Sequence, residues 1–569
     1  MKNILLLLLC LPLITLAQST IIRDVNLLDV ETKTLREGTS VVITDSRVTA
    51  IDDFANLKTS ADDRIIEAGG KFLIPGLIDA HIHFFQSGGL YTRPDAVDLR
   101  RVRPYTEEIQ FAKDNAADYL QRYLRLGITT VMDVGGPMWN FTVRDSIAAG
   151  MLSPDVLVTG PLFSIVARPQ MDEGDPPIVK VTNREEIDAL FEQMLPNKPD
   201  FMKIWYIASR QYPPQETYPL VEYIGQLCDE NNLRLAVHAT QLETAQLAVK
   251  AGADILVHSV DNAAIPEDFA RELAEKQVTY IPTLTVSNGY FRAFTGQLNH
   301  TDQDLAFANP HAYNTLMDLE RIPETQWPNR LKAIYKSGTP PNSSTTDSLM
   351  ARNLRMLSEL GANIATGTDA GNIGTMHASS YMPELLAMKQ AGLSNWDLLV
   401  YSTLNPAKGF GKGDQLGSIK AGKQSDMVLL SQNPLQDIGH LEDIELVIKA
   451  GQVLPVDSIL QETPEQIVQR QVNAYNARDI DAFLGTYAAD VEVYNEQGEL
   501  SMKGHEQMRA TYGPMFERVT NLYCDIQNRI VLNNKVIDRE HVRFGDRYSD
   551  VVAIYDVADG KIVKVRFIR

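Results

Sequence analysis

Residues 75–83 read PGLIDAHIH, an apolar run that ends in two histidines two positions apart. Because side chains on a strand repeat every two residues, His81 and His83 point in the same direction. Similar short apolar runs recur at residues 127–133, 155–159, 201–205, 233–238, 254–258, 279–282 and 363–369. With residues 72–79 they make eight buried strands with helical patterns between them, which predicts an α/β fold, a (β/α)8 TIM barrel over residues 76–404.

The flanks of this region have shorter strand-like patterns. Residues 18–75 and 405–457 both alternate apolar and polar positions, and we expect them to join in one small β-sandwich domain beside the barrel. Residues 452–463 read as a polar linker. Residues 463–569 predict a separate α+β domain, because TPEQ at 463–466 supplies an N-cap threonine, a first-turn proline and a capping-box glutamine. The dipeptides at 533–534 and 559–560 predict turns between its strands.

The first 17 residues have the pattern of a secretory signal. Lys2 precedes an apolar run, and small residues lead to a predicted cleavage site after Ala17. The run is shorter than the roughly 18 residues that a membrane span needs. We therefore expect a secreted or periplasmic protein with no integral membrane segment, the alternative being an uncleaved anchor.

Composition narrows the class of partner. The chain has 569 residues, 53 basic and 73 acidic, for a net charge of −20, which argues against nucleic acid and anionic membranes as partners. Residues 463–569 are nearly balanced, with 14 basic and 16 acidic residues, so the acidity belongs to the larger part. Three cysteines exclude a disulfide framework, and we expect Cys228 and Cys524 to be unpaired.

Three further residues occupy the ends of predicted strands. His238 ends the fifth strand, His258 the sixth and Asp369 the eighth. The carboxyl ends of barrel strands meet at one mouth, so these side chains should converge with His81 and His83. Imidazole and carboxylate groups are ligands for zinc, manganese or iron. The alternative, five unrelated structural residues, does not explain their shared position.

Lys203 lies inside the apolar fourth strand. An ammonium group facing two divalent metals would be repelled, whereas carbamylation by carbon dioxide would turn it into an anion that can bridge metals. The spacing alone leaves open a lysine whose head reaches water, or an ion pair inside the barrel.

Together these motifs resemble the amidohydrolase superfamily over about residues 20–455, closest to its imidazolonepropionase-like and prolidase-like branches. The motifs lie at residues 75–83, 127–131, 202–204, 237–239, 257–259, 366–371 and 422–428. The resemblance implies two divalent ions, zinc with manganese or iron as alternatives. His81, His83 and Asp369 would bind the first ion, His238 and His258 the second, and an N6-carboxylysine at Lys203 would bridge them.

The expected reaction is hydrolysis of an amide C–N bond in a small substrate such as a dipeptide, an N-acyl amino acid or a cyclic amide. Divalent metals acidify water at neutral pH, and Asp369, the catalytic residue, would carry a proton to the leaving nitrogen. Two alternatives remain open. One is hydrolysis of a lactone or phosphotriester, and the other is a non-catalytic barrel scaffold with a ligand-binding C-terminal domain.

Substrate contacts are expected from three residues near the mouth. Tyr206 and Arg210 follow the Lys203 strand, and His377 follows the eighth strand. An arginine there could hold a carboxylate. The strand-poor, proline-rich residues 284–350 predict a lid over the site.

Residues 463–569 resemble a SnoaL-like cone, a fold of helices on a curved sheet. The matching features lie at residues 475–479, 487–493 and 504–505. Without a convincing acid–base pair, we expect interaction or ligand binding there, and a homo-oligomer through the barrel or this domain.

Overall fold

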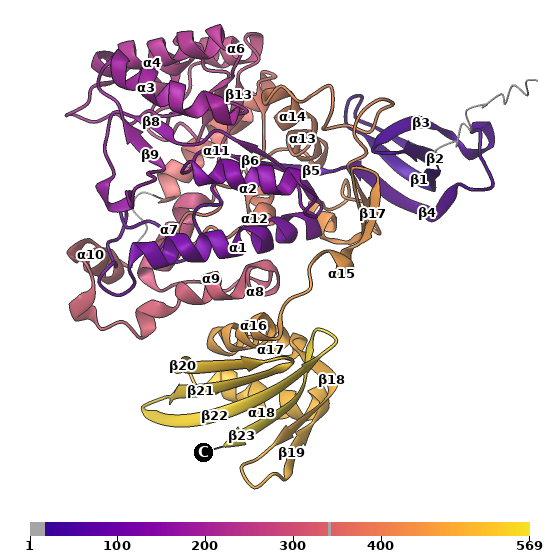
Figure 1. The fold of residues 1–569 in the computed structure, drawn as a ribbon, viewed down its shortest axis with the longest axis vertical. Helices are drawn as coiled ribbons and strands as arrows, with labels where there is room; N and C mark the ends of the chain where they lie inside the picture. The colour runs from indigo at the N-terminus through magenta and orange to yellow at the C-terminus, as the bar shows by residue number, and fades with distance from the viewer. Residues whose placement is uncertain (1–17, 339–342, 569) are drawn as a thin grey trace, which may run out of the picture.

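The computed structural model describes residues 18–338 and 343–568, so the predicted signal at residues 1–17 lies outside the described residues. Figure 1 shows a central α/β part, a small β domain on one side of it, and a C-terminal domain at one end. In the described parts of the chain, no helix is long and apolar enough to cross a membrane.

The two chain flanks form one continuous sheet instead of the two layers of the predicted sandwich. Its strand order is β17-β16-β15-β4-β1-β2-β3. The strands are β1 (Ser19–Asp29), β2 (Thr34–Thr44), β3 (Arg47–Asp53), β4 (Arg64–Pro75), β15 (Met427–Leu430), β16 (Ile444–Lys449) and β17 (Gln452–Pro455). The sheet is continuous because β4 pairs parallel with β1 and antiparallel with β15. The predicted linker therefore begins with an edge strand, followed by α15 (Val456–Ile459).

The first predicted barrel strand, residues 72–79, is divided between two sheets at Gly76. Residues before it belong to β4, and residues after it to β5 (Leu77–Ile82). The Gly76 amide donates to the carbonyl of Asp426 in the small domain, at 2.9 Å. A Cβ at this position would lie 2.1 Å from Oγ1 of Thr129, so glycine lets the chain pass between the domains.

The remaining predicted strands all form, but in two parallel sheets instead of one closed ladder. The sheet orders are β5-β6-β7 and β14-β13-β12-β11-β10-β8-β9. The strands are β6 (Ile128–Asp133), β7 (Asp155–Val158), β8 (Leu162–Ser164), β9 (Ile178–Lys180), β10 (Met202–Trp205), β11 (Leu235–His238), β12 (Ile255–Val257), β13 (Thr279–Ile281) and β14 (Asn363–Ile364). β8 and β9 were not predicted.

Backbone hydrogen bonds join the two sheets beside β5. The Ala80 amide donates to the Thr366 carbonyl at 2.9 Å, and the Asp369 amide donates to the His81 carbonyl at 2.8 Å. These bonds place the end of β5, which carries His81, next to the segment after β14, which carries Asp369.

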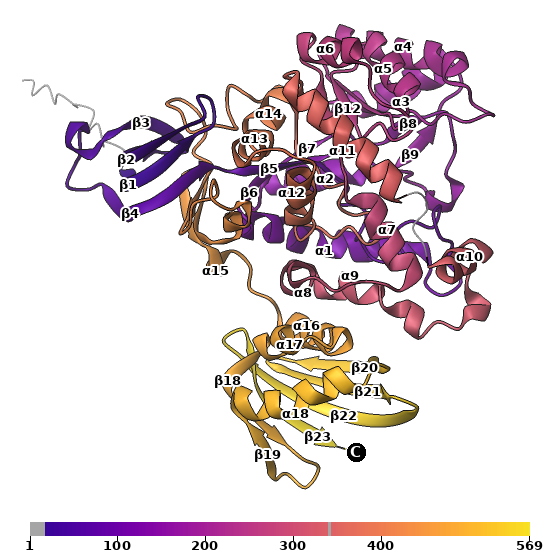
Figure 2. The ribbon, with the colours of Figure 1, turned by 180° about the vertical axis from the view of Figure 1, so that it is seen from behind.

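Helices surround these sheets (Figures 1 and 2). They are α1 (Tyr105–Arg125), α2 (Trp139–Ala148), α3 (Arg184–Met194), α4 (Pro214–Glu230), α5 (Leu242–Lys250), α6 (Glu267–Glu275), α12 (Tyr381–Gln390), α13 (Asn395–Tyr401) and α14 (Leu404–Gly409). The predicted lid, residues 284–350, has no strand in its described part but is mostly helical. Its helices are α7 (Val286–Thr295), α8 (Asp302–Phe307), α9 (Pro310–Thr315), α10 (Asn329–Ser337) and the start of α11 (Ser343–Glu359). These helices pack on the rest of the central part because Phe294, Leu305 and Tyr313 share a buried core with Leu90 and Leu99.

The C-terminal domain is a six-stranded sheet with helices against one face. The strand order is β19-β18-β23-β22-β21-β20. The elements are α16 (Pro464–Ala477), α17 (Ile480–Gly485), β18 (Tyr487–Tyr494), β19 (Leu500–Lys503), α18 (Gly504–Arg518), β20 (Leu522–Leu532), β21 (Lys535–Phe544), β22 (Arg547–Ala558) and β23 (Lys561–Ile568). The predicted capping box is confirmed, because Thr463 and Gln466 each accept the other's backbone N–H. Both predicted turns join hairpins.

Helix α16 attaches this domain to the central part, next to α8 and α9 (Figure 2). Arg470 of α16 donates to the carbonyls of Leu305 and Ala308 and pairs with Glu462. Glu462 also pairs with the buried Arg122 of α1, at 2.9 Å. Cys228 and Cys524 are free and buried, as expected.

Candidate metal centre and active-site cavity

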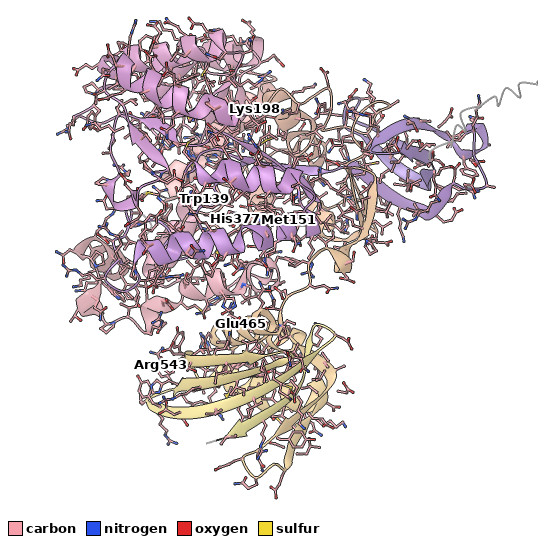
Figure 3. The ribbon with its side chains drawn as sticks, viewed as in Figure 1. Trp139, Met151, Lys198, His377, Glu465 and Arg543 are labelled. Carbon is pink, nitrogen blue, oxygen red and sulfur yellow. The ribbon has the colours of Figure 1, made fainter. Side chains whose placement is uncertain are left out.

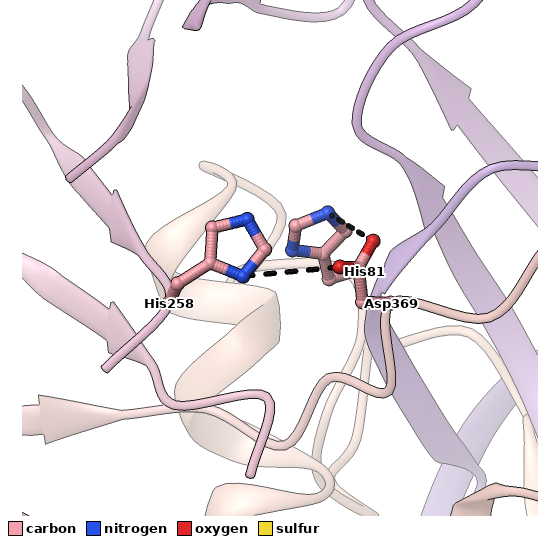
Figure 4. Close-up of side chains that lie close together, drawn as sticks. All are labelled: His81, His258 and Asp369. Carbon is pink, nitrogen blue, oxygen red and sulfur yellow. Dashed lines mark ion pairs between the residues drawn. The ribbon is translucent and has the colours of Figure 1, made fainter. Parts of the chain in front are cut away.

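The structure brings the strand-end histidines and Asp369 together. His81 belongs to β5, His83 follows it, and His258 follows β12. Nε2 of His81 and Nε2 of His83 lie 3.3 and 3.2 Å from Oδ1 of Asp369. Nδ1 of His258 lies 3.9 Å from the other oxygen, so both oxygens of this carboxylate face an imidazole (Figure 4).

One ligand atom each of His81, His258 and Asp369 falls within a sphere of metal-site size. These three atoms all lie within 4.8 Å of one another. The ring of His238 is 4.5 Å from that of His258, measured between centroids. A cavity of about 270 Å³ is lined by all six predicted ligands, His81, His83, Lys203, His238, His258 and Asp369.

Burial favours the neutral form of three of the imidazoles, those of His81, His238 and His258. It lowers the pKa of His81 to about 4 and that of His238 to about 3, and it lowers the pKa of His258 well below its usual value. A neutral imidazole has a lone pair for a metal ion. The Nδ1–H of His83 donates to the Gly135 carbonyl at 2.7 Å. The lone pair on Nε2 of that ring is then free to bind a metal ion.

The backbone at the site is in an unusual conformation. His258 has φ 75°, Thr283 φ 45° and Asp369 φ 59°, in the left-handed region that non-glycine residues adopt at a cost of about 1–3 kcal/mol. Oγ1 of Thr283 lies 2.7 Å from Nδ1 of His258. The fully buried Glu384 accepts the next two backbone N–H groups, those of Leu284 and Thr285, at 2.8 and 3.0 Å. This carboxylate therefore holds the turn that orients His258.

Lys203 has the least conventional surroundings. Its side chain is 2% exposed, and its Nζ has no hydrogen-bond partner among the described residues. Burial lowers the pKa of Lys203 to about 7, against the opposing attraction of Asp369. An unpaired ammonium in such a site is costly, so the neutral amine is accessible. The donor set of neutral imidazoles, one carboxylate and an available amine fits divalent transition metals.

The three predicted substrate contacts do not line this cavity. The Tyr206 hydroxyl is turned away and donates to the Pro214 carbonyl at 2.6 Å, and Arg210 lies on the surface. His377 is buried inside the central part (Figure 3), where it donates to the Gln86 carbonyl and stacks on Tyr119. His377 therefore contacts the cavity wall only indirectly, through Gln86, which is one of the lining residues.

Sequence reasoning missed several lining residues, namely Arg93, Trp205, Tyr290 and Asn372. Asn372 stands three positions after Asp369 and could have been noticed beside the motif at 366–371. Arg93 and Tyr290 come from a loop and from α7, and no periodicity marks them. Arg93 pairs with Asp95 at 2.7 Å, and Arg168 shares the same carboxylate at 3.3 Å.

A second cavity, of about 760 Å³, lies in the C-terminal domain. Its lining includes Tyr475, Tyr487, Tyr555 and Glu540. The Tyr555 hydroxyl donates to the buried Glu540 carboxyl at 2.8 Å, and burial raises the pKa of Glu540 to about 7.

Comparisons with known proteins match the central part and the C-terminal domain to two different families. The sequence model of the amidohydrolase family matches residues 72–454, and that of the SnoaL-like domain matches residues 468–565. Imidazolonepropionase from Symbiobacterium thermophilum is 23% identical over 406 residues, which cover 69% of this chain and 84% of the relative. A solved Xaa-Pro dipeptidase with bound methionine is 22% identical with a TM-score of 0.58, and the match covers 77% of this chain and all (100%) of that one.

Several matches to curated proteins are short. A 5-methylthioadenosine/S-adenosylhomocysteine deaminase from Teredinibacter turnerae is 34% identical over 86 residues, 14% of this chain and 20% of the relative. Several curated relatives are matched over less than a third of their own length. The structural neighbours imply a TIM-barrel-like fold. Because the family match covers more than half of the sequence, the chain belongs to the amidohydrolase family and has a SnoaL-like domain at its C-terminal side.

Proposed function

We propose that this protein is a metal-dependent hydrolase that cleaves an amide C–N bond in a small molecule. The observation that carries the proposal is the meeting of four histidines, Asp369 and the unpartnered Lys203 in one cavity. Relatives named imidazolonepropionase, guanine deaminase and Xaa-Pro dipeptidase support C–N hydrolysis as the reaction class.

The cavity would hold two divalent ions, with zinc first and manganese or iron as alternatives. His81, His83 and Asp369 would hold one ion, and His238 and His258 the other. The Lys203 amine would add carbon dioxide, forming one N–C bond and releasing one proton, to give an N6-carboxylysine anion between them. We also propose that the two parallel sheets are arcs of one (β/α)8 barrel. The hydrogen bonds between β5 and the segment after β14 support this arrangement.

When bound, the ions would acidify water and polarise the substrate carbonyl. Burial by itself would raise the pKa of Asp369, but its contact with His81 holds the pKa well below its usual value. Asp369 is therefore ionised at neutral pH, can accept a proton from water and can deliver it to the leaving nitrogen.

The charge at one edge of the cavity favours a substrate with a carboxylate. Two guanidinium groups, Arg93 and Arg168, share the single carboxylate of Asp95, which leaves one positive charge at this edge. Arg168 also lies over the ring of Trp205, a lining residue, at 4.5 Å. A dipeptide or an N-acyl amino acid would supply the missing anion, whereas a lactone or a phosphotriester would not.

The test combines metal analysis with matched substrates. Protein reconstituted with zinc or manganese should hold about two equivalents. It should hydrolyse N-acetyl amino acids or dipeptides at least about tenfold faster than their C-terminal amides, because one charge-assisted contact is lost. Asp369→Asn should be inactive. An absence of bound metal after reconstitution, or hydrolysis of lactones alone, would reject the proposal.

The second cavity favours ligand binding in the C-terminal domain as an additional role. Its volume of about 760 Å³ lies within the usual range for small-molecule sites. The full chain should bind about one equivalent of a neutral aryl probe such as N-phenyl-1-naphthylamine. Val542→Trp, which fills the cavity, should abolish that binding and leave hydrolysis unchanged. Equal binding by both proteins would place the probe elsewhere.

We also propose that the chain is exported, on the pattern of residues 1–17. Sequencing the N-terminus of exported protein should find residue Gln18 first.

A further inference from the structure

Three separate segments meet at Asn372, a buried residue that is 3% exposed. Its amide Nδ2 donates to Oδ1 of Asp369 at 2.7 Å and to the backbone carbonyl of Asp369 at 3.1 Å. Its Oδ1 accepts from Nη1 of Arg93 and from the hydroxyl of Tyr290, each at 2.7 Å. Arg93 comes from the loop before α1, and Tyr290 from α7.

These partners fix the orientation of the amide. Arg93 has no acceptor atom, so an amide turned by 180° would set its NH₂ group against the guanidinium. Burial raises the pKa of Tyr290, so its hydroxyl keeps the proton that it donates. With two donors on its oxygen, Asn372 presents its NH₂ group to Asp369.

The position of that NH₂ group selects between the two oxygens of Asp369. Oδ1 lies between Asn372 and the Nε2 atoms of His81 and His83. Oδ2 faces His258 at 3.9 Å and does not share the Asn372 contact. An Asp carboxylate rotates easily about its last torsion, so a directed donor is needed to keep these two oxygens distinct.

Arg93 strengthens the hydrogen bond from Asn372 to Asp369. A positive charge on the acceptor side of an amide polarises it and makes its N–H groups better donors. Arg93 carries that charge and lines the cavity beside Asn372. Helix α7 keeps Tyr290 in place because Gly289 packs directly on Gly374, where an added Cβ would lie 2.8 Å from the carbonyl oxygen.

We propose that Asn372, oriented by Arg93 and Tyr290, is the positioning residue that sets Asp369 for proton transfer. The inference rests on the proposed hydrolase function. Asn372 acts through Asp369 and needs no contact with the substrate. Its loss should therefore slow proton transfer while metal binding and substrate affinity persist.

The first test is steady-state kinetics of the reconstituted full-length enzyme. Asn372→Ala should lower kcat about 100-fold, the scale of a misplaced general base, with KM changed less than about threefold. Metal content should stay at about two equivalents. Asn372→Asp should be worse, because a second carboxylate would repel Asp369. Asn231→Ala, at an exposed helix end, is the matched control and should leave kcat unchanged.

A double-mutant cycle separates positioning from packing. Tyr290→Phe should lower kcat about three- to tenfold in the parent, since one donor to Asn372 is lost. It should have almost no further effect in the Asn372→Ala background, because Tyr290 acts through Asn372. Independent, multiplicative effects would overturn the proposal. So would an Asn372→Ala enzyme that loses metal and raises KM with kcat kept.

Cobalt substitution gives a readout other than activity. Asn372→Ala should shift the visible absorption bands of the cobalt-loaded protein, because Asp369 reorients, whereas Asn231→Ala should not. Unchanged bands would overturn the positioning role. If the cobalt bands differ between the parent and Asn372→Ala but the parent hydrolyses no amide, the positioning role stands and only the proposed function is rejected. A parent that binds no cobalt would reject both.

Discussion

Lys203 poses the sharpest question at the scale of a single residue. Sequence alone left open a lysine reaching water or an ion pair. The side chain is 2% exposed, which excludes the first, and Nζ has neither an ion-pair nor a hydrogen-bond partner within the described residues, which excludes the second there. The buried position therefore favours the neutral amine, which supports the N6-carboxylysine proposed above.

Lys203→Ala should therefore remove most bound metal and activity, and added acetate or propionate should restore part of both by filling the gap. Lys203→Arg should not help, because guanidinium stays cationic. Labelling with ¹³C carbon dioxide should give a carbamate signal in the parent. The exposed Lys180→Ala is the control. A free amine at Lys203 in an active sample with two metals would contradict the assignment.

Glu540 gives a pH prediction away from the metal centre. Burial raises its pKa from 4.5 to about 7. Between these values the folded state keeps a proton that the unfolded state loses, so the free energy of unfolding falls as pH rises from about 4.5 to 7, by about 3 kcal/mol at 1.36 kcal/mol per pH unit. Glu540→Gln, which does not titrate, should remove this slope. The measurement is the difference in Tm between parent and variant from pH 4 to 8, and a constant difference would contradict the shift.

At the scale of elements, α7 matters most for the site. The sequence predicted residues 284–350 as a lid because prolines are frequent and strands absent. The structure replaces the expected loop with short helices on a shared core, and α7 supplies Tyr290 to the wall of the cavity. Prolines at helix starts, such as Pro310 in α9, are compatible with helix, which explains the difference.

Gly289→Ala should disturb this wall. Its Cβ would lie 2.7 Å from Oγ1 of Thr375 and 2.8 Å from the Gly374 carbonyl, so α7 must move away from the loop that carries Asn372. We expect a loss of about 1–3 kcal/mol in stability, a lower kcat and unchanged metal content. Gly513→Ala is the control, since its Cβ would meet nothing within 4 Å in α18. Equal behaviour of the two variants would show that α7 does not position the site.

At the scale of the whole molecule, a buried charge network joins the C-terminal domain to the central part. Arg122, 1% exposed, pairs with Asp118 at 2.7 Å and with Glu462 at 2.9 Å. Glu462 also pairs with Arg470, whose guanidinium caps carbonyls at the end of α8. The sequence predicted residues 463–569 as a separate domain, and through Glu462 its first helix shares a charge network with α1.

Arg122→Met should remove the cation that pairs with Asp118 and leave Glu462 paired with Arg470 alone. We expect destabilisation of about 3–5 kcal/mol, measured as a lower midpoint of thermal or denaturant unfolding. Arg271→Ala, which breaks an exposed pair within α6, should cost less than about 0.5 kcal/mol. Similar losses for both would mean that the network does not hold the domains together.

The sequence by itself determined the position of eight apolar strands, the capped start of α16, two hairpin turns of the C-terminal domain and the set of metal-ligand candidates. Each of these depends on local rules. Periodicity marks buried strands, capping residues mark helix starts, and the ends of parallel strands share one edge. Residues His81, His83, His238, His258 and Asp369 could be named because their strands could be counted.

Only the tertiary structure decided what surrounds those residues. Arg93, Tyr290 and Asn372 come from three segments far apart in sequence. Thr283 contacts His258, and Glu384 binds the backbone that follows Thr283. Contacts between segments also decide three other features. They are the division of the strand at Gly76, the single sheet of the small domain and the orientation of the Tyr206 hydroxyl away from the cavity. A local pattern fixes which face a side chain takes on its own element, but close packing between elements decides which partner it meets there.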